Sequence, residues 1–580
     1  MKSKKFGVAV LCLLISLHCF GQQKPDLPDT TGYLIQDNVM IKTKYGITLS
    51  AVMVRKKGVK DKLPAALFYF IYSNTNRSLT EAKYAADHGY VGIVADSRGK
   101  RLSPDKPEPY EHEAKDVNAV IDWIIAQPWS DGRVGMYGGS YSGFAQWAAT
   151  KNLHPALKTI VPYVAAIPGL GLPMENNVFL TANYQWAFYV TNNKYTDDAV
   201  NNDNARWRRM RGNWWESGAA YNRIDSIDGT PNPWLQKWLS HPDYDAYWQS
   251  MVPYKKDFKN INIPVLTITG YYDDGQVSAL EYLREHYKYN AAAEHYLIIG
   301  PYDHFGAQHG GSADLRGYKV DSIALINTRE ITFQWLDYIL KGGKKPDLLK
   351  DKINFEVMGA NTWRHTPSLE KMEGNKVRFY LDSIPGGTSI LSQKRPLKPD
   401  FIFQKVDLAE RKSSNNDYYP DPIIKKEIDR SNGLFFMTRP FEKAVSVSGA
   451  LQGELKAVIN KKDMDVGLVL YEVTPDGSYF QLSYYLGRAS HAYDMSRREL
   501  LVPGKLETIP FYRSRRFSKQ LQKGSRLLLV LNIDKNPFAQ INYGTGKDVS
   551  FETVKDAGDP LEIRWSTESF IELGVSDSGF

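Results

Sequence analysis

The stretch GMYGGSYSGF, residues 135–144, constrains the fold of this chain more than any other, because it joins a strand to a helix without a loop. Residues 133–137 (RVGMY) are typical of a buried strand, and residues 141–150 (YSGFAQWAAT) are typical of a buried helix. Two glycines and Ser140 are all that lies between them, so the backbone must turn sharply, as glycine allows. We therefore predict a tight strand-to-helix turn with Ser140 at its tip.

Two apolar runs precede this turn, residues 66–72 (ALFYFIY) and 91–96 (VGIVAD). Continuous runs of this kind are typical of strands that are buried on both faces of a parallel sheet. Between residues 113 and 126, apolar side chains recur at helical spacing and predict one buried helix face: Val117, Val120, Ile121, Ile124 and Ile125. The alternation of strands and helices predicts a doubly wound α/β sheet.

The α/β pattern stops after residue 166 and resumes near residue 263, which divides the predicted core into residues 24–166 and 255–345. The segment between, residues 167–254, has no strand rhythm and holds seven of the thirteen tryptophans: Trp186, Trp207, Trp214, Trp215, Trp234, Trp238 and Trp248. We interpret it as a helical cap inserted into the core. Its tryptophans serve as cap core, and some as walls of a substrate pocket.

The last part of the chain, residues 346–580, follows a linker-like stretch rich in lysine and glycine. Short β-rich segments are separated there by Pro, Gly and Asp turns: residues 377–381, 444–447, 466–473 and 526–533. This pattern predicts a C-terminal β-sandwich domain of the jelly-roll type.

The first 21 residues are typical of a secretory signal peptide, with three lysines, an apolar run over residues 6–20 and cleavage after Gly21. A retained anchor is one alternative, but the run is short for a membrane span. A lipid on Cys19 is another, although His18 stands where a lipoprotein signal has a small residue. We expect a secreted or periplasmic protein that is neither a lipoprotein nor membrane-spanning.

Composition excludes several classes of function. The net charge of +8 includes three leader lysines, and the remaining Lys and Arg are mixed with acids, which argues against a nucleic-acid partner. Both cysteines, Cys12 and Cys19, lie in the leader, so the mature chain has no disulfide and no Cys-ligated metal. An HExxH motif is absent from the sequence as well. We therefore expect no metal and no cofactor.

Ser140 stands where a hydrolase of the α/β class places its nucleophile, after a core strand and before a helix. The usual G-x-S-x-G pattern is not met, because Ser142 occupies the place of the last glycine and Gly143 follows one position later. A purely structural Gly-Gly-Ser turn is the alternative interpretation.

A nucleophilic serine needs a histidine base that is held by a carboxylate. In this fold the acid and then the histidine follow later strands of the sheet. Asp273 follows the apolar residues 264–270, and His304 follows residues 295–300. We assign Ser140, Asp273 and His304 as the catalytic residues; the alternatives are Asp274 for the acid, and His309 or His286 for the base.

An oxyanion hole is also required. The backbone N–H of Tyr141, directly after the nucleophile, is one expected donor. The second donor commonly comes from a glycine run after an earlier strand, and no such run follows residues 66–72. A side-chain donor is implied instead, and Tyr72 is our choice.

These residues resemble the cocaine esterase, α-amino-acid ester hydrolase and X-Pro dipeptidyl-peptidase family of α/β-hydrolase serine hydrolases. The resemblance rests on an ordered set of motifs: VADSRGK (94–100), DWIIAQPWSDGRVGMYGGSYSGFAQW (122–147), HPALK (154–158), GYYD (270–273), GPYDH (300–304) and VMGANTWR (357–364). The family elbow is G-x-S-Y-x-G, which Gly138, Ser140, Tyr141 and Gly143 match. Gly143 is thus the expected glycine.

The resemblance implies an α/β-hydrolase core, an inserted helical cap and a C-terminal jelly roll. It also implies a tyrosine hydroxyl in the oxyanion hole, which Tyr72 supplies, although Ile71 replaces the family's proline. HPDYDAYWQ, residues 241–249, is most similar to the α-amino-acid ester hydrolase branch, in which carboxylates bind the α-ammonium group of the substrate. Candidate substrate-binding residues are Asp243, Asp245, Asp274 and Trp248, with a structural role as the alternative for each acid.

The sequence thus predicts a secreted serine hydrolase that cleaves small esters or amides through an acyl-enzyme, most similar to an α-amino-acid ester hydrolase or acylase. Its expected partners are small-molecule esters, amides or short peptides, and the oligomeric state stays open, a homo-oligomer included. An exopeptidase of the X-Pro dipeptidyl-peptidase type is the second hypothesis. The third is a non-catalytic protein that binds a glycan or a protein partner.

Overall fold

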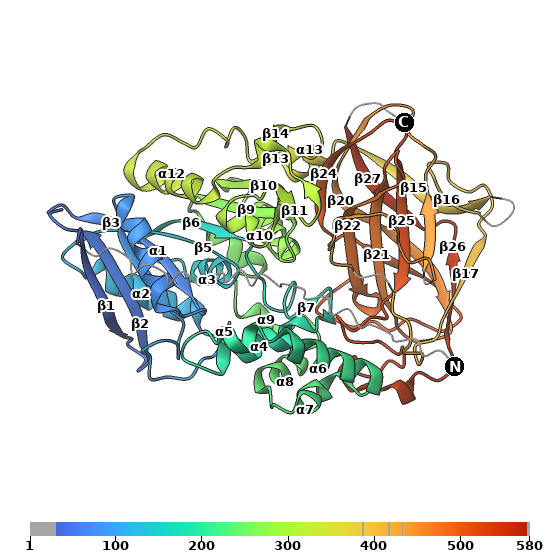
Figure 1. The fold of residues 1–580 in the computed structure, drawn as a ribbon, viewed down its shortest axis with the longest axis horizontal. Coiled ribbons are helices and arrows are strands. Elements are labelled where there is room, and N and C mark those ends of the chain that lie inside the picture. The colour runs from blue at the N-terminus through green and yellow to red at the C-terminus, as the bar shows by residue number, and fades with distance from the viewer. Residues whose placement is uncertain (1–30, 385–387, 416–417, 432, 577–580) are drawn as a thin grey trace, which may run out of the picture.

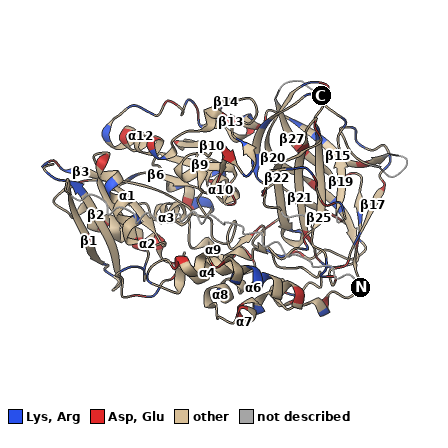
Figure 2. Ribbon diagram, viewed as in Figure 1, with Lys and Arg blue, Asp and Glu red and all other residues tan. Residues whose placement is uncertain are grey.

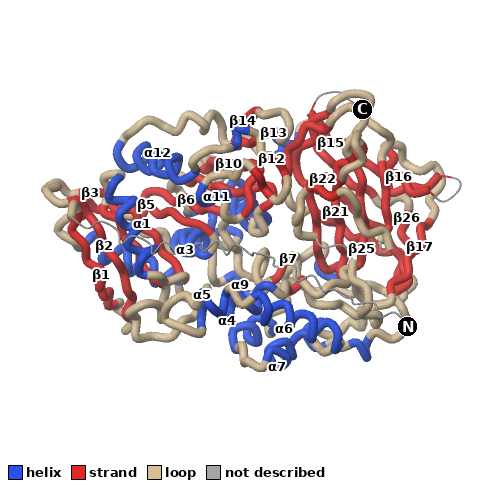
Figure 3. The backbone as a smooth tube through the Cα atoms, in the orientation of Figure 1, coloured by secondary structure: helices blue, strands red, loops and turns tan. Residues whose placement is uncertain are grey.

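The computed structural model describes residues 31–384, 388–415, 418–431 and 433–576, so the predicted leader lies outside the described residues. Figure 1 shows an α/β core beside a β-rich domain, with a row of helices along one side of both. Figure 3 separates the same parts by secondary structure: helices gather in the core and in that row, and strands fill the last domain.

The core is built on a ten-stranded sheet. Its strands lie in the order β1 (Tyr33–Lys42), β2 (Thr48–Lys56), β4 (Val91–Asp96), β3 (Leu63–Phe70), β5 (Ser130–Gly139), β6 (Leu157–Tyr163), β9 (Val265–Tyr272), β10 (His295–Asp303), β13 (Ile353–Val357) and β14 (Thr362–Thr366). The central strands from β4 to β13 are parallel, whereas β1, β2 and β14 pair antiparallel. The carboxyl ends of the parallel strands therefore meet at one edge, where such folds place their sites.

Helices connect these strands and lie along the faces of the sheet (Figure 1). The larger ones are α1 (Thr75–Asp87), α2 (Glu113–Ile125), α3 (Tyr141–Thr150), α10 (Gln276–Tyr289) and α12 (Thr328–Lys341), with the short α11 (Gly306–His309) and the hairpin β11 (Asp314–Leu315) and β12 (Tyr318–Lys319) after β10. In α2, Val117, Val120, Ile121 and Ile124 are completely buried, whereas Ile125 is 39% exposed. The predicted helix is present, and its last apolar residue lies at the edge of the buried face.

The inserted segment between β6 and β9 is mainly helical, as predicted. It holds the hairpin β7 (Met174–Glu175) and β8 (Val178–Phe179) and the helices α4 (Ala182–Thr191), α5 (Asp198–Asn201), α6 (Asn204–Ser217), α7 (Ile224–Asp228), α8 (Pro233–Leu239) and α9 (Ala246–Gln249). Side chains of Asp197, Asp203, Asn232 and Asp245 cap four of these helices. Such caps satisfy N–H groups that a helix leaves free at its start.

The C-terminal part is all-β. Its strands are β15 (Asn375–Ile384), β16 (Thr388–Ser392), β17 (Phe401–Val406), β18 (Ile424–Lys425), β19 (Leu434–Met437), β20 (Val445–Ile459), β21 (Asp465–Val473), β22 (Tyr479–Arg488), β23 (Leu506–Phe511), β24 (Arg516–Leu521), β25 (Arg526–Ile533), β26 (Leu561–Ser566) and β27 (Phe570–Ser576). The long strand β20 pairs with β23, β24, β26 and β27 along its length.

The core sheet extends past the boundary predicted at residue 346 by one hairpin. Strand β13 pairs in parallel with β10, and β14 pairs with β13, so residues 353–366 complete the core sheet. The lysine- and glycine-rich stretch before them is the connection from α12 to β13, not a linker between domains. The β domain begins after the short helix α13 (Leu369–Glu373).

Charged residues of both signs are scattered over all parts of the molecule, without a stripe of one sign in the view of Figure 2. Within the described residues, none of the helices combines the length and the hydrophobicity that a membrane crossing requires.

Candidate active site

Ser140 lies at the turn between β5 and α3, with φ 61° and ψ −120°. A residue with a side chain pays a steric cost at positive φ, so this turn is strained. Two backbone bonds hold it: the N–H of Ser140 donates to the carbonyl oxygen of Tyr163 at 3.0 Å, and the N–H of Phe144 donates to the carbonyl oxygen of Ser140 at 3.0 Å. The predicted turn is present, with Ser140 at its tip.

The glycines of the turn are explained by close contacts. A Cβ atom on Gly139 would lie 2.3 Å from Oε1 of Gln308, and one on Gly143 would lie 2.8 Å from the carbonyl oxygen of Tyr163. That carbonyl is the acceptor that holds Ser140, so a larger residue at position 143 would disturb the turn itself. The last glycine is therefore needed at 143, whereas position 142 accommodates a buried serine.

Asp273 and His304 meet at the carboxyl ends of β9 and β10. Nδ1 of His304 donates to Oδ1 of Asp273 at 2.9 Å. The carboxylate is completely buried and also accepts from Oγ1 of Thr269 at 2.8 Å and from the N–H of Gly275 at 3.0 Å. With Nδ1 engaged, Nε2 is the nitrogen of His304 left to accept a proton.

Asp274 places a second carboxylate beside the same histidine, with Oδ1 3.1 Å from Nδ1 of His304. Burial opposes a charge on His304, but Asp274 and Asp273 outweigh it and raise the pKa of His304 well above its usual value. Partial burial also opposes the charge of Asp274, yet His304 and Arg515 hold the pKa of Asp274 below its usual range. The imidazole thus lies between two acids.

Gln308 connects the histidine loop to the serine turn. Its Nε2 donates to the carbonyl oxygen of His304 at 2.8 Å, and its side chain lies against Gly139, where a Cβ atom would collide with it. The side chain of Ser140 is partly exposed, and that of His304 is 22% exposed. Contacts through one glutamine therefore place the two loops side by side.

The two candidate oxyanion donors, Tyr141 and Tyr72, lie close to each other. Tyr141 is the first residue of α3, and the first N–H groups of a helix have no partner within it. Tyr72 follows β3, and its ring packs edge-on against that of Tyr141 at 6.5 Å. The phenol oxygen of Tyr72 accepts a hydrogen bond from Nε1 of Trp186 at 2.9 Å, so its own hydrogen remains available to donate.

The two histidines considered as alternative bases, His309 and His286, lack such a carboxylate partner. His309 is exposed, and among the described residues no hydrogen bond joins it to a carboxylate; partial burial and the nearby Arg329 and Arg77 lower its pKa. His286 is completely buried, where its ring nitrogens meet His295 at 3.1 Å and the carbonyl oxygen of Ile261 at 3.0 Å. Neither alternative base therefore has the carboxylate that orients His304.

Of the predicted substrate-binding residues, only Asp274 lies beside the triad. Asp243 accepts from Nε2 of His491 at 2.7 Å, and Asp245 caps α9 and contacts Nδ1 of His241 at 2.7 Å. Trp248 is completely buried and donates to the carbonyl oxygen of His241. The assignment of Trp248 is therefore wrong, because it has no surface to offer a substrate.

Several residues of the site were not predicted from the sequence. Thr269 could have been found, because it lies in β9, four residues before Asp273. Gln308, Trp186 and Arg515 act through contacts between segments distant in sequence, for which a single sequence has no pattern.

The fold and this set of groups define a serine hydrolase of the α/β-hydrolase class. Residues 45–306 match the family described as X-Pro dipeptidyl-peptidase (S15 family), and residues 349–560 match the X-Pro dipeptidyl-peptidase C-terminal non-catalytic domain. The chain belongs to this family, which includes the cocaine esterases.

Proteins similar to this one match it over nearly the whole chain. Cocaine esterase of Rhodococcus sp. (strain MB1 Bresler) is 23% identical over 90% of this chain and 95% of its own. An aminopeptidase from a marine sediment archaeon, Thaumarchaeota archaeon, has a TM-score of 0.76 at 19% identity, covering 94% of this chain and 97% of that one. An α-amino acid ester hydrolase has a TM-score of 0.74 at 20% identity, covering 95% and 100%. These structures share the fold.

Proposed function

We propose that this protein hydrolyses small carboxylic esters or amides through an acyl-enzyme on Ser140. The observation that carries the proposal is the bond of 2.9 Å between Nδ1 of His304 and the buried Asp273, next to a strained serine turn. His304 takes the proton of Ser140 as the hydroxyl attacks the carbonyl carbon and returns it to the leaving group. Water, activated by the same histidine, then releases the acyl group.

Charge develops on the carbonyl oxygen during each attack. The N–H of Tyr141 and the hydroxyl of Tyr72 are our candidates for the donors that stabilise it. Asp273 keeps His304 in the tautomer that presents Nε2 and stabilises the imidazolium that forms.

For the acyl group, we propose a substrate with a free α-amino group. Asp274 supports this choice, because its carboxylate is 49% exposed next to His304 and stays ionised. An ammonium group in the acyl part would find an opposite charge there. Asp243 and Asp245 are engaged elsewhere, so the proposal rests on Asp274 alone.

The test compares kcat/KM for phenylglycine methyl ester with that for its N-acetylated form, with Ser140→Ala as the blank. We expect a preference for the free amine that Asp274→Asn reduces at least about tenfold, a loss in the range expected for a partly buried charge pair. Asp243→Asn is the matched control, because it removes a carboxylate bonded to His491. Equal rates for both esters would contradict the ammonium site while leaving the hydrolase intact.

A dipeptidyl-peptidase activity is the second candidate, favoured by the family match over residues 45–306. It predicts release of p-nitroaniline from Ala-Pro-p-nitroanilide faster than from Ala-Ala-p-nitroanilide. We also propose secretion after cleavage at Gly21, which the N-terminal sequence of the mature protein would test.

A further inference from the structure

A segment of the β domain covers the loop that carries Asp273 and Asp274. It is residues 513–516, which comprise the end of the connection from β23 to β24 and the first residue of β24. The guanidinium of Arg515 donates to Oε1 and Oε2 of Glu175 at 2.7 and 2.8 Å and to the carbonyl oxygen of Asp274 at 2.9 Å. One side chain of the β domain thus joins the cap hairpin to the loop of the acid.

Gln276 makes a second connection at the start of α10. Its Oε1 accepts from the N–H of Arg516 at 2.6 Å, and its Nε2 donates to the carbonyl oxygen of Arg516 at 3.0 Å and to that of Gly270 at 2.8 Å. A single buried amide therefore ties the β-domain backbone to the end of β9, three residues before Asp273.

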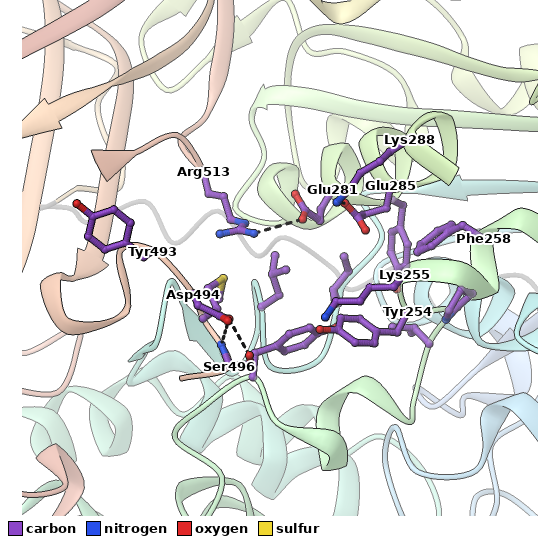
Figure 4. A pocket seen from close by; sticks show the side chains of 17 residues that line it. Tyr254, Lys255, Phe258, Glu281, Glu285, Lys288, Tyr493, Asp494, Ser496 and Arg513 are labelled. Carbon is purple, nitrogen blue, oxygen red and sulfur yellow. Dashed lines mark hydrogen bonds and ion pairs between the residues drawn. The ribbon is translucent and has the colours of Figure 1, made fainter. Parts of the chain in front are cut away.

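Arg513 reaches further along the same helix. Figure 4 shows it pointing from the β domain toward Glu281 on α10, at one side of a cavity of about 220 Å³. The two side chains form an ion pair at 3.6 Å, and Arg284 contacts the same carboxylate. The loop and the first turns of α10 are thus held by three residues of one segment, Arg513, Arg515 and Arg516.

Arg515 is enclosed on all sides. Its guanidinium lies 3.7 Å from the ring centre of Tyr484, and Arg515 and Glu175 are both about 3% exposed. A buried charge of this kind needs its partner, so removal of either residue leaves the charge of the other uncompensated. Neither Arg515 nor Glu175 forms a hydrogen bond or an ion pair with Ser140. Arg515 reaches the loop of the acid by donating to the carbonyl oxygen of Asp274.

We propose that residues 513–516 are a positioning element of the active site, in which Arg515 fixes the loop of the catalytic acid and makes the β domain necessary for turnover. The proposal rests on the proposed function, because it assigns a consequence to the orientation of Asp273 and His304. A shift of about 1 Å in that loop would misplace the base, and misplacements of that size cost about 100-fold in rate.

The experiment uses the full chain with Arg515→Lys, Arg515→Met and Gln276→Glu. Lysine can still donate to Glu175 or to the carbonyl oxygen of Asp274, but it lacks the planar fork that reaches both. The matched control is Arg488→Met, because Arg488 forms a buried bidentate pair with Asp465 at 2.9 Å inside the β domain. That pair does not contact the β9–α10 loop.

We expect Arg515→Met to lower kcat about 30- to 100-fold with KM changed less than threefold, and Arg515→Lys to recover part of the loss. Gln276→Glu keeps the size of the side chain and loses the donor, so it is expected to lower kcat even if Arg515→Met does not fold. Arg488→Met is expected to lower the melting temperature and to keep kcat within about twofold.

Wild-type kcat in folded Arg515→Met and Gln276→Glu would overturn the proposal, as would an equal loss in Arg488→Met. Labelling by a fluorophosphonate distinguishes a failure of the positioning proposal from a failure of the proposed function. If Ser140→Ala abolishes labelling and turnover, the function stands, and the kcat of the Arg515 variants decides the present inference alone.

Discussion

The indole N–H of Trp186, in the cap, donates a hydrogen bond of 2.9 Å to the phenol oxygen of Tyr72, in the core. A phenol that accepts in this way keeps its own hydrogen for another acceptor. Because Tyr72 lies beside Tyr141 at the serine turn, the cap orients a donor that the core alone would leave free to rotate.

Tyr72→Phe should lower kcat about 100- to 1,000-fold, the loss typical of removing one oxyanion donor. Trp186→Phe should lower kcat less, because Tyr72 keeps its hydroxyl. Tyr189→Phe is the control, since its ring stacks on Tyr72 at 6.4 Å and the change leaves that ring in place. Steady-state kinetics on an ester substrate measures all three, and an unchanged kcat in Tyr72→Phe would remove Tyr72 from the oxyanion hole.

Ser140→Ala should abolish labelling by a fluorophosphonate and lower kcat/KM by about 1,000-fold or more, because the nucleophile is lost. Ser142→Ala, two residues along the same turn, should label and turn over like the wild type. Ser142 is buried but has no place in the proposed chemistry. Labelling that persists in Ser140→Ala would place the nucleophile elsewhere.

The pH dependence of kcat/KM should follow His304, which accepts the proton of Ser140 only when neutral. Below its pKa the histidine is charged and activity is lost, so kcat/KM should rise with pH, with a midpoint above the usual value for histidine. Asp274→Asn removes one of the two acids that raise this pKa, so the midpoint should move to lower pH. A midpoint that does not move would show that Asp273 alone sets the pKa of His304.

Gly143→Ala should destabilise the protein by about 1–3 kcal/mol, because the added Cβ lies 2.8 Å from the carbonyl oxygen of Tyr163. Gly212→Ala, in α6, is the matched control, since a Cβ there meets nothing within 4 Å. Alanine has the higher helix propensity, so this change should stabilise by up to about 1 kcal/mol. Thermal unfolding of the two variants should shift the melting temperature in opposite directions.

The sequence predicted much of the site, because a strand that ends in Gly-Gly-Ser and continues as a helix permits little else. The order of Asp273 and His304 after later strands could also be read directly, since parallel strands bring their carboxyl ends to one edge. The core with its helical insertion followed from apolar periodicity, which reports burial residue by residue.

The sequence did not reveal features that depend on contacts between distant segments. Nothing local shows that residues 353–366 add a hairpin to the core sheet, because β13 pairs with β10 more than fifty residues earlier. The burial of Trp248 was equally hidden, because aromatic residues that line pockets and those that fill cores look alike in a sequence.

By itself, the sequence determined the fold class and the tight turn at Ser140, and it placed the candidate acid and base after later strands, because these features depend on local backbone geometry and chain order. Only the tertiary structure decided which side chains from other parts of the chain contact these residues. The contacts of Trp186 with Tyr72, of Gln308 with Gly139 and of Arg515 with the Asp274 loop join the cap, the core and the β domain. These contacts form between side chains that are far apart in the sequence and come together only in the folded chain. No local pattern in the sequence therefore predicts them.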